Sequence, residues 1–123
     1  MLRVVRDDIR RRLFVTEEGE ISFAQIATFL DTQLEQGTWS YSVLHDARAA
    51  TTDLRPEDSR LLLTRIQRGA DSRRRGPVAV VTGDERTRAV VTAHAAMAHE
   101  IGLRIAVFGD LESAELWLDR EAV

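Results

Sequence analysis

Side chains that could do chemistry gather after two predicted strands. His45 and Asp46 stand at the end of a predicted strand over 39–45, and Thr82 and Asp84 follow the apolar run at 78–81. In open α/β sheets, ligands bind at the carboxyl ends of parallel strands. The sequence therefore predicts a ligand or partner site from these two segments: His45, Asp46, Arg48, Thr51, Thr52, Thr82 and Asp84.

Each acidic candidate also has a structural interpretation. The Asp46 carboxylate can accept hydrogen bonds from its own loop or pair with Arg48. Asp84 and Glu85 stand where a helix begins, so they satisfy its dipole and would repel a phosphate. Helix capping is therefore favoured over an anion site at 82–86.

His45 and Asp46 could also serve as the acid/base pair of a small hydrolase-like enzyme. Neighbouring residues of a strand point to opposite faces, which argues against their cooperation unless the strand has already ended. The chain has no nucleophile-elbow signature. We therefore assign no catalytic residue and keep the hydrolase as the alternative.

The histidines do not predict a metal site. His94 and His99 are five residues apart, which places them about 140° apart around a helix with 3.6 residues per turn. His94 lies on an apolar stripe and is expected to be a hydrogen-bonded core residue, whereas His99 is expected to face solvent. No metal and no cofactor are predicted.

Two missing residue types exclude whole chemistries. The chain has no cysteine, which excludes disulfides and thiolate nucleophiles. All 17 basic residues are arginine, so Schiff-base chemistry and a phosphate-loop lysine are excluded too. A receiver-type phosphorelay domain has the same element order but needs a lysine near its aspartyl phosphate.

Charge and hydropathy limit the partners. The net charge is −3, so a broad attraction to nucleic acid is not expected. The triplets at 10–12 and 73–75 have acidic neighbours, so a solvated edge strand and a solvated loop are predicted for them. No apolar run approaches the ~20 residues that span a bilayer, and no signal peptide is recognisable. A cytoplasmic protein without stable membrane insertion is expected.

The elements that must position these side chains form one predicted domain, 1–123. Strands are predicted at 2–7, 9–16, 39–45, 78–81 and 103–108, a turn at 17–20, and helices at 22–36, 56–68, 84–101 and 110–119. This alternation predicts parallel strands joined by right-handed crossovers. The fold class is α/β, with a mixed, mostly parallel sheet of four or five strands covered by four helices.

Segment 76–118 resembles the C-terminal half of SpoIIAA-like proteins, the STAS or STAS/SEC14 group. The resemblance rests on "GPVAVVTGD", on a helix ending "HEIG", and on "LRIAVFGDLESAELWL". It implies a mixed sheet with helices on its faces, and protein recognition or small-ligand sensing rather than catalysis.

One branch of that group, the anti-sigma-factor antagonists, is phosphorylated on a serine of an Asp-Ser-Ser-Gly motif after the strand equivalent to 39–45. Here Asp46 is followed by "ARAATTD", which has neither serine nor glycine. A phosphorylation switch could therefore use only Thr51 or Thr52.

These observations predict a non-catalytic, STAS-like regulatory or binding module. Its target would be a protein partner or a small apolar or anionic ligand, recognised by the loops at 46–55 and 82–86. A homodimer, formed through an exposed helix face or an edge strand, is a further hypothesis.

Overall fold

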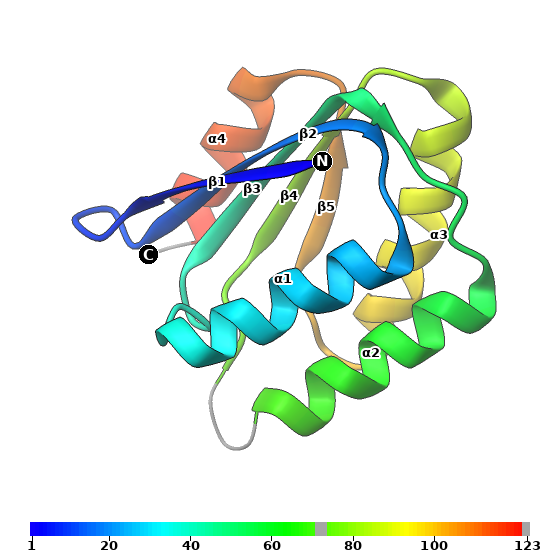
Figure 1. Ribbon diagram of the computed structural model, residues 1–123. Helices are drawn as coiled ribbons and strands as arrows, with labels where there is room; N and C mark the ends of the chain where they lie inside the picture. Colours follow the sequence, from blue (N-terminus) through cyan, green and yellow to red (C-terminus); the bar gives the residue numbers. More distant parts are fainter. Residues whose placement is uncertain (71–73, 122–123) are drawn as a thin grey trace.

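The sheet has five strands in the order β1-β2-β3-β4-β5, in a computed structural model that describes residues 1–70 and 74–121 (Figure 1). β1 is antiparallel to β2, and β2 to β5 are parallel to one another. The strands are β1 (Leu2–Asp7), β2 (Arg12–Glu20), β3 (Ser42–Thr51), β4 (Val78–Thr82) and β5 (Ile105–Phe108). The predicted fold class is confirmed.

Four helices cover the sheet and begin at the residues that the sequence indicated. They are α1 (Phe23–Gln36), α2 (Pro56–Ala70), α3 (Glu85–Glu100) and α4 (Leu111–Glu121). At α1, Ser22 and Gln25 form a capping box, and Gly37 ends the helix with a φ of 70°. Asp84 and Asp110 accept hydrogen bonds from the first turns of α3 and α4.

The helices divide unequally between the two faces of the sheet (Figure 1). α1, α2 and α3 lie on one face, where they pack on Val43 and Val78. α4 alone covers the other face, where Leu118 packs on Leu44 and Val81. β4 is buried on both faces, as its continuous apolar sequence predicted.

Several predicted strand boundaries were wrong. β2 begins at Arg12 rather than at Ile9, and β3 begins at Ser42 rather than at Trp39. The strand predicted to end at His45 continues to Thr51, and residues 17–20 belong to β2 rather than to a turn. The reason is mutual pairing, since the polar ends of β2 and β3 hydrogen-bond to each other. The pairing passes from Thr16–Asp46 to Glu18–Ala49, which gives β3 one extra residue and makes a bulge.

Within the described ranges, no helix is long and apolar enough to cross a membrane.

Candidate functional site

An apolar cavity of about 120 Å³ lies between the sheet and the three helices that share its face. Its wall includes Phe29 of α1, Leu62 and Ile66 of α2, Val80 of β4 and Val91 of α3. Four elements that are distant in sequence thus contribute to a single chamber. A cavity with such a wall suits a small apolar molecule.

His45 and Glu17 form a hydrogen-bonded pair in the cavity wall. Nδ1 of His45 lies 2.6 Å from Oε1 of Glu17, and the two side chains are only 15% and 13% exposed. The ring of Phe29 meets the imidazole edge-on, with 5.4 Å between centroids. These contacts hold the imidazole in one orientation.

His94 of α3 is a second polar group of the wall. Its Nδ1 lies 3.0 Å from the hydroxyl oxygen of Ser59. Burial, and secondly the positive charge of Arg75, lower the pKa of His94 below its usual 6.5. The side chain is therefore neutral at pH 7, and the prediction of a hydrogen-bonded histidine on the apolar stripe is confirmed.

Arg75 is the third polar group of the wall, and it corrects an expectation. The triplet 73–75 was predicted to be a solvated loop, and Arg74 is indeed exposed, but Arg75 is only 9% exposed. Its Nη1 donates to Oε1 of Gln33 at 2.9 Å, and its guanidinium carbon lies 4.5 Å from the centre of the Trp39 ring. Arg73 lies outside the described residues.

The first arginine triplet needs the same correction. Arg10 and Arg11 are exposed, as predicted, but they lie in the turn before β2 rather than in a strand, and Arg12 is only 2% exposed. Arg12 donates to Oγ of Ser42 at 2.9 Å and to Oδ1 of Asp119 at 3.0 Å. Its buried charge thus has an acidic partner.

Three of the predicted site residues line the cavity: His45, Thr51 and Thr52. Thr51 is exposed at the end of β3, whereas Thr52 is buried and donates its hydroxyl proton to the carbonyl oxygen of Ile21 at 3.0 Å. Ala47 and Ala50 also line the cavity, because the bulge brings both to the same face of β3.

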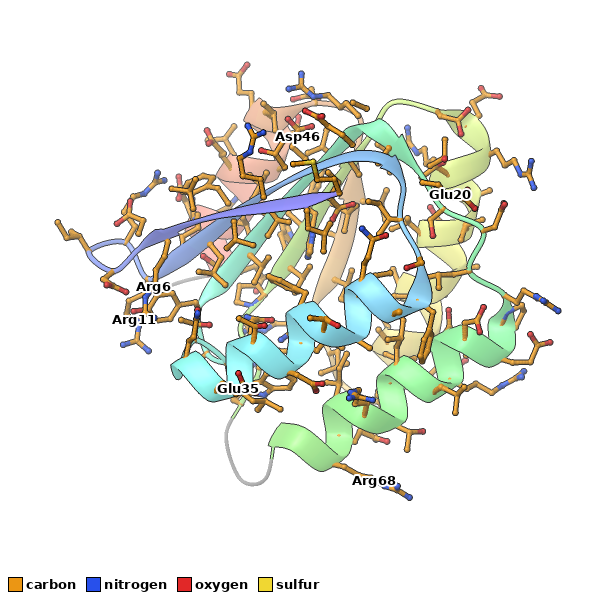
Figure 2. All side chains as sticks on the ribbon, viewed as in Figure 1. Arg6, Arg11, Glu20, Glu35, Asp46 and Arg68 are labelled. Carbon is orange, nitrogen blue, oxygen red and sulfur yellow. The ribbon has the colours of Figure 1, made fainter. Side chains whose placement is uncertain are left out.

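Asp46 and Arg48 do not line the cavity. Asp46 lies two residues after Leu44 and therefore on the face of α4, at the end of the sheet far from α1 and α2 (Figure 2). Its carboxylate accepts from Nε and Nη2 of Arg48, both at 2.8 Å, and these hydrogen bonds lower its pKa. The local pairing that the sequence suggested is the one observed.

The segment at 82–86 lies beside the end of β3. A Cβ on Gly83 would come within 2.6 Å of the carbonyl oxygen of Arg48, so the two backbones touch. Asp84 accepts from the backbone and the hydroxyl of Thr87, which lowers its pKa and leaves it engaged as the α3 cap. Thr82 is buried, and its hydroxyl oxygen has no hydrogen-bond partner among the described residues.

His45 and Asp46 do not form the acid/base pair that the hydrolase alternative needs. His45 faces Glu17 in the cavity, while Asp46 pairs with Arg48 on the opposite face of β3. In the part of the chain that the structure describes, no group of three or more potential ligands could hold a metal ion.

Sequence reasoning missed Glu17, Arg75 and the apolar wall. Glu17 had been placed in a turn, and nothing in a run of three arginines marks the one that is buried. One local signal was present, since Arg75 directly precedes Gly76 and Pro77, which open the strand β4. A residue so close to a buried strand has little room to reach solvent.

The chain was compared with known proteins. No family model matches it, and no curated protein does. Among solved structures it is similar to the anti-sigma factor antagonist SpoIIAA in its unphosphorylated form, with 14% identity over 98% of this chain and 96% of that chain and a TM-score of 0.52. It is also similar to an uncharacterized DUF3478 protein from Shewanella loihica PV-4, with 15% identity over 96% and 92% of the two chains and a TM-score of 0.55. That protein is described as having a SpoIIAA-like fold, and this chain has the same fold, as the sequence resemblance implied.

Proposed function

We propose that this protein is a non-catalytic binding module that holds a small apolar ligand between its sheet and helices α1 to α3. The observation that carries the proposal is the cavity itself, with aromatic and aliphatic side chains from both layers around it. The polar groups in its wall are already oriented by Glu17, Ser59 and Gln33. Small-molecule sites typically have an apolar wall that contains a small number of polar groups held in fixed orientations.

The small residues in the wall support the same proposal. Larger side chains could have filled this space, yet Ala47 and Ala50 stand in its wall. A ligand of matching size would make close contacts with the apolar side chains around it.

Toluene is a suitable neutral probe, because it is close in size to the space available. In a two-dimensional NMR titration we expect its shifts to concentrate on cavity residues such as Val80 and Ile66. Val91→Phe should fill the cavity and weaken toluene binding at least about tenfold, equivalent to about 1.4 kcal/mol. Val90→Phe is the matched control, because the wall includes Val91 but not Val90. Equal binding by both variants, or shifts scattered over the surface, would refute the proposal.

Recognition of a protein partner is the second candidate. The solved SpoIIAA is described as an anti-sigma factor antagonist, and the loops at 46–55 and 82–86 of this chain lie against each other. A phosphorylation switch there would use Thr51, since the hydroxyl of Thr52 is buried and hydrogen-bonded. If this surface binds the partner, Asp46→Ala combined with Thr82→Ala should abolish the complex and leave toluene binding unchanged. A complex that survives both substitutions would remove this surface from consideration.

A further inference from the structure

Among the described residues, no acidic group compensates the charge of Arg75. Its Nη1 donates to the neutral amide oxygen of Gln33, while its Nε is buried and donates to no group of the described chain. No carboxylate within residues 1–70 and 74–121 forms an ion pair with it. Arg12, which is also buried, pairs with Asp119. The two buried arginines therefore differ, because within the described residues only Arg12 has an acidic partner.

Such a cation is costly for the fold. Removing a charge from water is unfavourable unless an opposite charge and hydrogen bonds compensate it. Burial lowers the pKa of Arg75 to about 10, so the guanidinium is still positive at neutral pH. The Trp39 ring and the Gln33 amide recover only part of this cost. An anion brought by a ligand would recover more.

The guanidinium selects the kind of ligand by its charge. Arg75 is one of the residues that line the cavity, and a single carboxylate would supply one opposite charge and oxygen acceptors for its N–H groups. A compact carboxylate also fits the size of the chamber. About 120 Å³ is near the ~150 Å³ of an engineered apolar cavity that takes up benzene.

The charges in the wall also orient the ligand. Glu17 lies beside His45, and His45 is level with Val80 of β4. Within the same wall, Glu17 repels a carboxylate beside His45, whereas Arg75 attracts one.

We propose that the ligand is a monocarboxylic acid with a small apolar body, its carboxylate paired with the Arg75 guanidinium and its body packed against the apolar wall of the cavity. This inference rests on the proposed function, because it names the chemical class that the cavity selects. Benzoate is the probe, and benzyl alcohol is its neutral counterpart of nearly equal size.

Calorimetry on the wild-type chain should show benzoate binding at least about tenfold more tightly than benzyl alcohol. Arg75→Met keeps an apolar stem against Trp39 but has no positive charge, so it should bind the two probes equally. Arg74→Met, which changes the exposed neighbour, should retain the wild-type preference. Benzyl alcohol binding by Arg75→Met would show that the cavity of this variant is intact.

The outcomes separate the two proposals. If benzyl alcohol binds but benzoate binds no better, or if Arg75→Met keeps the preference, the carboxylate inference is wrong while the apolar site stands. If neither probe nor toluene binds, the proposed function fails as well. Should Arg75→Met not fold, the guanidinium N–H resonances of Arg75 in the wild-type chain decide, since a bound carboxylate must shift them and benzyl alcohol must not.

Discussion

At the scale of single residues, His94 makes the stability of the protein depend on pH. Its pKa is lowered in the folded chain, mainly by burial and also by Arg75, so the unfolded chain takes up a proton that the folded chain does not. The contribution of His94 to the free energy of unfolding is therefore fully present above about pH 6.5. It declines as the pH falls below that value, by at most about 1.4 kcal/mol per pH unit.

This dependence can be measured by urea unfolding at pH 7.5 and pH 5.5. We expect His94→Gln to lose less stability across that interval than the wild-type chain. His99→Gln, which changes an exposed histidine, should keep the wild-type slope. Carboxylates with a lowered pKa, such as those of Asp46 and Asp84, contribute in a separate window near or below pH 4. An identical slope in His94→Gln would show that this side chain is not the source.

At the scale of elements, the turn between β4 and α3 requires a glycine for reasons of space. Both "TGD" at 82–84 and "FGD" at 108–110 join a strand to a helix capped by the aspartate. A Cβ on Gly83 would lie 2.6 Å from the backbone oxygen of Arg48, whereas on Gly109 its nearest neighbour would be 3.9 Å away, at the end of the Arg88 side chain.

Gly83→Ala should therefore destabilise the protein by roughly 1–3 kcal/mol, because two backbones must separate. Gly109→Ala should change the free energy of unfolding by less than about 0.5 kcal/mol. Chemical denaturation of the two variants checks both values. Equal effects would mean that the contact with Arg48 is not what the glycine accommodates.

The same elements show why some features were predictable and others were not. The starts of α1, α3 and α4 depend on residues within four positions of one another, so Ser22, Asp84 and Asp110 marked them correctly. The end of β3 depends on pairing with β2, some thirty residues earlier, and no local pattern at Asp46 reveals that partner. For the same reason Glu17 was assigned to a turn.

The cavity was less predictable still. It needs side chains from separate elements to face one space, and the bulge in β3 decides that Ala47 and Ala50 share a face. His45, Thr51 and Thr52 were proposed because the strand was expected to end at His45, where ligands collect, although β3 continues to Thr51. Arg75 was not proposed, since within a run of three arginines the one local sign of burial was its position directly before Gly76 and Pro77.

At the scale of the whole molecule, the sheet separates α4 from the proposed binding site. α4 packs on the face opposite the cavity, where Leu118 and Ala114 are fully buried. Leu118→Ala should lower the free energy of unfolding by about 2–5 kcal/mol, while Leu116→Ala, on the same helix but 53% exposed, should have little effect.

Neither α4 variant should change the affinity for benzyl alcohol, provided that the measurement is made where the chain is folded. Urea unfolding and calorimetry on the same preparations test both halves of this prediction. A loss of affinity in Leu118→Ala that exceeds about twofold would show that the two faces are coupled through the sheet.

The stacking of Arg75 on Trp39 has a practical consequence. Indole emission responds to nearby charge, and the other tryptophan, Trp117, lies against Phe108 on the far side of the sheet. In a Trp117→Phe background, the fluorescence of the protein would come from the one indole beside the guanidinium. Binding of an acid that neutralises this cation would then shift the emission wavelength of Trp39, so binding could be followed without a label or dye.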